Sequence, residues 1–171
     1  MKLLLALALI LPLSAAPTVK TDIRYQRVRG SLPERQRLDV HYDDAKTKAK
    51  QPVLLWIHGG AWSFGSKEHA TPQKAAALHK AGIILVAINY RFHPQVTYQE
   101  QGADIATAIK WTRDHITAYG GDPNRLAVMG HSAGAHLAAL VATDQSYLKT
   151  AKVDPGIITA VIPLDGAGYD I

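Results

Sequence analysis

The sequence contains no cysteine among its 171 residues. This absence excludes a disulfide bond, a thiol nucleophile, a thiolate metal ligand and a lipid-modified cysteine after a leader peptide. No other group of residues implies a metal ion or an organic cofactor. We therefore expect chemistry that needs neither.

Long runs of one charge are also absent. Charged residues make up 19% and hydrophobic residues 47% of the chain, a balance typical of one globular domain. The net charge is +5, but the basic residues are scattered, and the densest group lies at residues 46–50 in an expected loop. Without aromatic residues among them or a longer basic stripe, these lysines indicate a solvated loop, and we expect no nucleic-acid partner.

The apolar run Leu3–Leu13 is too short to span a bilayer. It follows Met1-Lys2 and precedes Ser14-Ala15-Ala16, the order of regions in a secretory signal peptide. We expect residues 1–16 to be a cleaved leader, residues 17–171 to form the domain, and the mature protein to be secreted or periplasmic without membrane contact. An uncleaved anchor is the alternative.

Apolar strand patterns alternate with helical patterns along the rest of the chain, which predicts a doubly wound, mostly parallel α/β sheet. Two edge strands are expected to pair antiparallel around residues 30–33, and a polar loop is expected over residues 143–156. The expected strands cover residues 22–29, 35–42, 52–58, 83–89, 125–131 and 157–163. The expected helices run from Thr71-Pro72 to Gly82, over 98–119 and over 133–142.

The run Gly130-His131-Ser132-Ala133-Gly134 joins an expected strand to an expected helix. In a strand–turn–helix of this kind the serine sits in a strained backbone conformation, and its hydroxyl is exposed at the carboxyl end of the sheet. Glycines two positions either side are needed because a Cβ there would collide with the neighbouring strand or helix. The run predicts Ser132 as a nucleophile.

A second motif, His58-Gly59-Gly60-Ala61-Trp62, follows an apolar strand. Attack on an acyl carbon places negative charge on the carbonyl oxygen, which preorganised N–H donors must stabilise. Consecutive glycines leave the backbone free to supply such donors, and Ala133 adds one from the start of its helix. We predict an oxyanion hole formed by Gly59, Gly60, Ala61 and Ala133; an ordinary strand-ending turn is the alternative.

With these two motifs the sequence resembles the esterase and lipase branch of the α/β-hydrolase superfamily, including arylformamidase-like enzymes and bacterial feruloyl and acetyl-xylan esterases. The resemblance extends from about Leu38 to Asp170 and includes Asn89-Tyr90-Arg91 and the run from Gly120 to Arg125. It implies a serine carboxylesterase acting on a small ester or an acylated polysaccharide. Trp62 and Phe64 are expected either to line the acyl pocket or to cover the core.

In this superfamily the acid and the histidine of the triad follow the serine in the chain. By that comparison the sequence ends after about the sixth of eight strands, so the sheet is expected to be incomplete at its C-terminal end. Asp165 is a candidate for an atypical acid, or a turn residue before Gly166. His58 is expected to brace the glycine loop, and His131 to point away from the serine. The alternative function is a catalytically incomplete fragment or pseudoenzyme.

Overall fold

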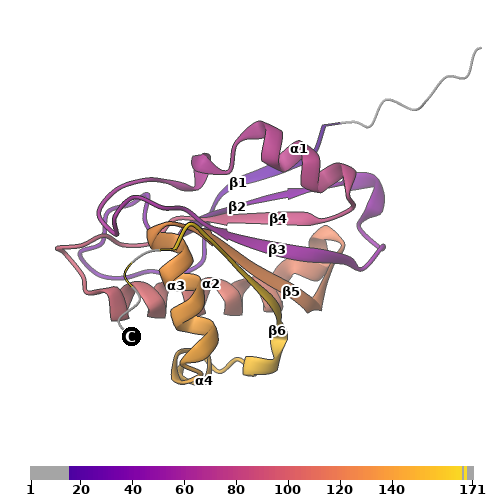
Figure 1. Cartoon of the computed structure of the whole chain (residues 1–171). Coiled ribbons are helices and arrows are strands. Elements are labelled where there is room, and N and C mark those ends of the chain that lie inside the picture. The colour runs from indigo at the N-terminus through magenta and orange to yellow at the C-terminus, as the bar shows by residue number, and fades with distance from the viewer. Residues whose placement is uncertain (1–15, 167, 169–171) are drawn as a thin grey trace, which may run out of the picture.

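Six strands form one mixed sheet in the order β1-β2-β4-β3-β5-β6 (Figure 1). The computed structural model describes residues 16–166 and Gly168. The strands are β1 (Thr18–Arg24), β2 (Arg37–Tyr42), β3 (Gln51–Ile57), β4 (Ile84–Ile88), β5 (Gly121–His131) and β6 (Ile158–Leu164). β1 and β2 are antiparallel to their neighbours, whereas β4, β3, β5 and β6 run parallel. The mostly parallel sheet predicted from the sequence is confirmed.

Helices cover both faces of this sheet, as a parallel sheet requires. They are α1 (Pro72–Lys80), α2 (Tyr98–His115), α3 (Ala133–Thr143) and the short α4 (Ser146–Thr150), with 3-10 turns at 44–46, 67–69, 116–119 and 155–157. Helix α1 lies on one face, and α2 and α3 lie on the other (Figure 1). Because β4, β3, β5 and β6 run parallel, their carboxyl ends lie at the same end of the sheet. The loops after β3, β4 and β5 all begin at that end.

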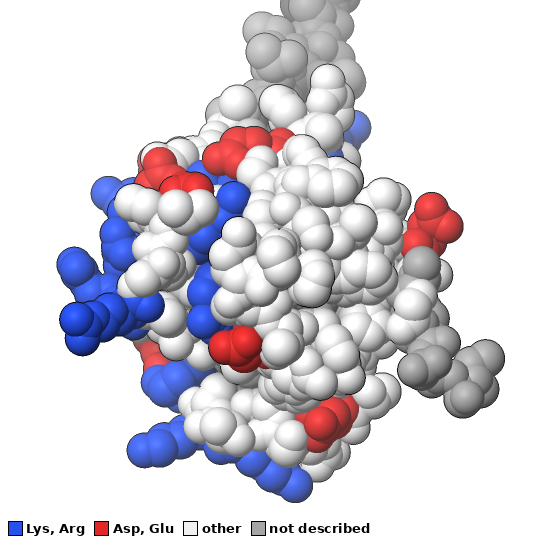
Figure 2. Space-filling view, turned by 90° about the vertical axis from the view of Figure 1, so that its left-hand side faces the viewer, with Lys and Arg blue, Asp and Glu red and all other residues white. Residues whose placement is uncertain are grey.

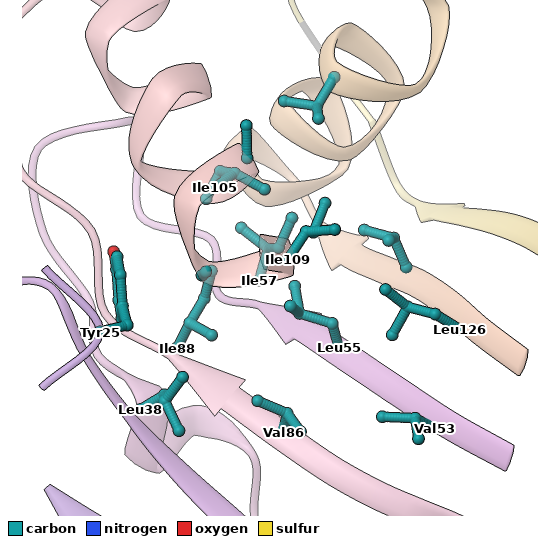
Figure 3. Packing of buried hydrophobic residues seen from close by; sticks show 14 of the residues in the cluster. Tyr25, Leu38, Val53, Leu55, Ile57, Val86, Ile88, Ile105, Ile109 and Leu126 are labelled. Atoms are coloured by element: carbon teal, nitrogen blue, oxygen red, sulfur yellow. The ribbon is translucent and has the colours of Figure 1, made fainter. Parts of the chain in front are cut away.

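The two faces of the sheet are packed by alternate residues of the same strands. On β3, Leu55 and Ile57 are fully buried and lie in one cluster with Ile105 and Ile109 of α2 (Figure 3). The intervening Trp56 packs on the opposite face, in a cluster that also includes Ala75 of α1. A central strand with both faces covered in this way is a rigid base for the loop that follows it.

Local hydrogen bonds explain where two helices begin. The Thr71 hydroxyl accepts a hydrogen bond from the Lys74 amide, and Pro72 occupies the first helical turn. Thr97 and Glu100 form a reciprocal capping box at the start of α2, with N···O distances of 3.3 and 2.9 Å. The starts of α1 at Pro72 and of α2 at Tyr98 agree with the prediction, whereas the capping box was not predicted.

The edge strands and the loop after α3 differ from prediction. The antiparallel pair comprises Thr18–Arg24 and Arg37–Tyr42 rather than residues 22–29 and 35–42. The chain leaves the edge after Arg24 because Tyr25 turns its ring into the core, where its hydroxyl donates to the Asn89 carbonyl at 2.7 Å. The expected loop 143–156 contains α4, whose Leu148 is buried.

The expected leader falls on residues 1–15, outside the described residues, and on Ala16. Across residues 16–166 and Gly168, no helix combines the length and the apolar character needed to cross a membrane.

Candidate active site

Ser132 lies between β5 and α3 in a backbone conformation that side chains rarely adopt, with φ 52° and ψ −120°. Its amide donates to the Leu164 carbonyl at 2.9 Å, and its own carbonyl accepts from Ala135 at 2.9 Å and from His136 at 3.2 Å. The strained turn is thus fixed by a neighbouring strand on one side and a helix on the other. Ser132 itself is partly exposed.

Two glycines make this turn sterically feasible. A Cβ on Gly130 would overlap the Gly134 carbonyl, where α3 crosses the end of β5. A Cβ on Gly134 would overlap the Ile57 carbonyl and lie 2.6 Å from that of His58. The collisions that the sequence predicted at these positions are therefore real, and they involve backbone atoms that cannot move aside.

The loop after β3 lies directly beside this serine. A Cβ on Gly59 would lie 3.2 Å from Ser132 Cβ, so only glycine allows this approach. Gly60 has φ +124°, and its carbonyl accepts from the amides of Ser63 and Phe64 at 2.9 and 3.0 Å, which closes the loop into a tight turn. Ala61 also has positive φ, at 46°. The structure therefore brings the predicted loop and the predicted serine together.

Three backbone amides at this junction are available to a ligand. Within the described part of the chain, the N–H groups of Gly60, Ala61 and Ala133 have no hydrogen-bond acceptor. Ala133 is the first residue of α3, where the helix dipole adds positive potential. Unsatisfied amides on both sides of a serine are suited to stabilising an oxygen anion.

The buried side chain of His58 holds the glycine loop (residues 58–62) in place, as predicted. Its fully buried ring stacks on Tyr90 with centroids 4.4 Å apart, and its Nδ1 is 2.7 Å from the Gly59 carbonyl oxygen. The Tyr90 hydroxyl donates to the His58 carbonyl at 2.9 Å. Burial lowers the pKa of His58 to about 4, so the ring is neutral at neutral pH.

A cavity of about 650 Å³ opens beside the turn, bordered by Trp62 of the loop and His136 of α3. The Trp62 indole donates to His136 Nδ1 at 3.3 Å, so loop and helix are joined across the cavity wall. Trp62 also packs against the core, which is one of the two roles expected for it. Phe64 does not line this cavity and is 61% exposed.

Sequence reasoning missed Gln101 of α2, which also lines the cavity. Its side-chain amide donates to the carbonyls of Trp62 at 2.7 Å and Arg91 at 3.0 Å, so it fixes the loop from the helix. A signal existed in the sequence: a glutamine one turn before Ile105 falls on the apolar face of α2, where a polar side chain needs a local partner.

No described side chain hydrogen-bonds to the Ser132 hydroxyl. His131 is exposed and makes no hydrogen bond to the serine hydroxyl, and its Nδ1 lies beside Gly59; the expected direction of its side chain stays a prediction. Asp165 follows β6 at the same edge of the sheet, is exposed, has φ 50°, and makes no ion pair or hydrogen bond with a described residue. Nor does any group of three His, Asp or Glu side chains in the described ranges fit a metal ion.

Comparison with known families gives one match that spans most of the fold. The family model described as BD-FAE matches residues 38–160, from β2 to the middle of β6. The matched range includes the serine turn, the glycine loop and every helix described above.

Individual relatives are named as ester hydrolases. A probable carboxylic ester hydrolase, LipM, of Mycobacterium tuberculosis is 38% identical over 71% of this chain and 27% of its own length. A probable isoprenylcysteine alpha-carbonyl methylesterase of Arabidopsis thaliana is 36% identical over 81% of this chain and 28% of its own. The chain thus spans less than a third of either relative.

Solved structures share the fold. Esterase B from Lactobacillus rhamnosis superposes with a TM-score of 0.65 at 23% identity, covering 88% of this chain and 47% of that one. Thermogutta terrifontis esterase 2 superposes with a TM-score of 0.59 at 27% identity, covering 76% and 47%. The sheet is that of an α/β-hydrolase, of which this chain spans about half.

Proposed function

Because the chain belongs to the BD-FAE family, we propose that this protein is a serine hydrolase of carboxylic esters in which Ser132 is the nucleophile. The observation that carries the proposal is the junction of β5 and α3. There a serine with φ 52° adjoins three amides that have no acceptor in the described part of the chain. A strained serine beside unused donors has no structural benefit, so a catalytic role accounts for it better.

The proposed reaction proceeds through an acyl-enzyme. Ser132 Oγ bonds to the acyl carbon and gives up its proton to a base, while the Gly60, Ala61 and Ala133 amides stabilise the oxyanion. The carbon–oxygen bond to the alcohol then breaks, and the alcohol leaves with a proton. Water attacks the acyl-enzyme, releases the acid and restores the hydroxyl. Gly59, also predicted as a donor, has no acceptor for its amide in the described part of the chain, and its lack of a side chain allows the loop to approach the serine.

The substrate class and location belong to the same proposal. The leader-like residues 1–16 support export, and an exported esterase would meet small esters or acylated polysaccharides outside the cytoplasm. The cavity beside the serine turn supports a bound acyl or alcohol group, because Trp62 and Leu140 give it apolar surface.

One observation favours a second candidate, a protein that binds esters without turning them over. Within the described residues, neither a histidine nor a carboxylate bonds to the Ser132 hydroxyl, so no base for the first step is in place. Such a protein would retain the cavity and the amides but not the reactivity of the serine.

Hydrolysis of p-nitrophenyl acetate separates these candidates. We expect turnover by the wild-type protein and a loss of at least about a thousand-fold in Ser132→Ala. Ser146→Ala, an exposed serine at the start of α4, is the matched control and should retain full activity. Activity retained in Ser132→Ala would refute the nucleophile. No turnover in wild type, together with no covalent labelling by an alkyl phosphonate, would favour the ester-binding candidate.

A further inference from the structure

A second cavity, of about 530 Å³, lies next to the proposed active site and has no role in the reaction described above. The connection from β1 to β2 and the connection from β4 to α2 form its walls, and Ser63 of the glycine loop borders it. His93 lines both this cavity and the one beside Trp62. The two cavities therefore share a wall at His93.

Among the charged residues that line the second cavity, cations prevail: Arg29, Arg35 and Arg91 stand against a single carboxylate, Glu100. Figure 2 views the face at the left of Figure 1, where the loops after β3 and β4 lie. Lys and Arg side chains gather along one side of that face, and most of the remainder is uncharged. The charge around the site is therefore unevenly distributed.

Two of the four charged groups are already paired with neighbours. Arg91 makes a two-pronged ion pair with the buried Asp104, with distances of 2.8 and 2.9 Å. Glu100 accepts from the Thr97 amide at 2.9 Å and lies 4.0 Å from Arg91. Neither group has much capacity left for a ligand.

Arg35 and Arg29, by contrast, are not fully paired with neighbouring residues. The Arg35 guanidinium lies over the Phe92 ring, 3.7 Å from its centroid, and only 15% of the side chain is exposed. Its ion pair with the exposed Glu34 is long, at 3.7 Å, and no guanidinium N–H of Arg35 donates a hydrogen bond to a described residue. Arg29 is exposed and has no partner among residues 16–166 and Gly168.

We propose that this cavity binds an anionic group carried by the substrate, a carboxylate or phosphate, and that the enzyme thereby prefers negatively charged esters. A planar guanidinium held over an aromatic ring has restricted freedom to turn its donors, which favours two-pronged recognition of such oxygens. We place the anion and the reacting ester on one molecule because His93 lines both cavities. This inference rests on the proposed esterase function.

Monomethyl glutarate and dimethyl glutarate test the inference, because they differ by one charge. We expect the full chain to have the higher kcat/KM for the monoester, and Arg35→Gln to lower that value about ten- to a hundred-fold, the effect of one charged hydrogen-bonding pair. The value for the diester should change less than about two-fold. Arg35→Lys should retain part of the preference, and added salt should reduce it.

Arg125→Gln is the matched control, because Arg125 is exposed near the start of β5, at the end of the sheet opposite the proposed active site. It should leave both substrates unaffected. Equal kcat/KM for the two esters in wild type would overturn the inference and leave the esterase function intact.

Binding gives a readout that does not depend on turnover. If neither ester is hydrolysed, the esterase proposal fails, and the cavity is tested by NMR titration with the same two compounds. Shifts at Arg35 and Phe92 with the monoester, absent with the diester and lost in Arg35→Gln, would support an anion site. Inorganic phosphate binding there without any preference for the monoester would indicate a site for a free anion, and would overturn the substrate assignment.

Discussion

The Ser132 amide donates a hydrogen bond of 2.9 Å to the carbonyl of Leu164, the last residue of β6. The bond joins the proposed nucleophile to a strand that pairs with β5 in parallel register up to His131 and Leu164. The serine turn is therefore held by the sheet and not by its own preference, since φ 52° with ψ −120° is unfavourable for any residue with a Cβ. At residue 132, the backbone conformation that serves the proposed activity should therefore lower the stability of the fold.

Replacing Ser132 with glycine should make the protein more stable. Glycine adopts positive φ freely, so the substitution relieves strain of about 1–3 kcal/mol, offset by about 0.5–1 kcal/mol because glycine gives the unfolded chain more conformational entropy. We expect the free energy of unfolding in urea to rise by about 1 kcal/mol. Ser132→Ala is the control, because it keeps the Cβ and should give no such gain. A destabilised glycine variant would show that the turn is not strained.

Asp165 next to Leu164 provides a test of the atypical-acid alternative. Its φ of 50° is a conformation that Asp and Asn both tolerate, and the carboxylate has no partner in the described part of the chain. We therefore expect Asp165→Asn to keep ester hydrolysis within a few-fold of wild type. A loss approaching about ten-thousand-fold, the effect of removing a triad aspartate, would instead identify Asp165 as the acid.

Gly134 should tolerate no side chain at all. In Gly134→Ala the new methyl group would overlap the Ile57 carbonyl, and backbone on both sides prevents relaxation. We expect a loss of at least about 3 kcal/mol in the free energy of unfolding, at the upper end for overpacking. Gly156→Ala is the control, since its methyl group would meet only Asp154 Oδ1 at 3.4 Å. Equal stability of the two variants would contradict the close packing of α3 on β3.

The serine turn and the glycine loop could be predicted because their requirements are local. Gly130 is dictated by its crossing with Gly134, four residues later, and the amides of Gly60 and Ala61 by a short turn within one loop. The collision at Gly134, with Ile57 of β3, is long-range, and only the motif indicated it. The alternation of apolar strand patterns with capped helical patterns is also local, and it predicted the order of the elements. Such features depend on neighbours only a few residues away.

The cavity walls could not be predicted because their residues meet only after folding. Gln101 acts on Trp62 across 39 positions of sequence, and Arg35 meets Phe92 between two separate connections. The alternation of polar and apolar residues also did not predict where β1 ends, because Tyr25 turns inward to contact Asn89, 64 residues away in the sequence. Contacts of this range leave no periodic signal in the sequence.

Asp104 should be essential for positioning the loop after β4. Its carboxylate is fully buried and accepts hydrogen bonds from the Arg91 side chain and backbone and from Gln36. In Asp104→Ala the Arg91 guanidinium, only 16% exposed, would lose its main partner. We expect a cost of about 3–5 kcal/mol, measured by urea unfolding.

Asp114 on the same helix provides the control for this prediction. It pairs with Lys110 and Arg113, but all three side chains are about one-third exposed. Asp114→Ala should therefore cost less than about 1 kcal/mol. A similar cost at both positions would show that burial of the Asp104–Arg91 pair is not what makes it important.

His58 should make stability depend on pH in the mildly acidic range. Burial lowers the folded-state pKa from 6.5 to about 4, so between these values the unfolded chain binds a proton that the folded chain does not. Unfolding is then favoured as pH falls, and the free energy of unfolding should decrease across this range by on the order of 3 kcal/mol. Urea titrations at several pH values measure this slope in the wild type and in His58→Gln, which has no titrating ring. The slope should be clearly smaller in the variant; an unchanged slope would mean that another group titrates and that His58 is not held neutral beneath the glycine loop.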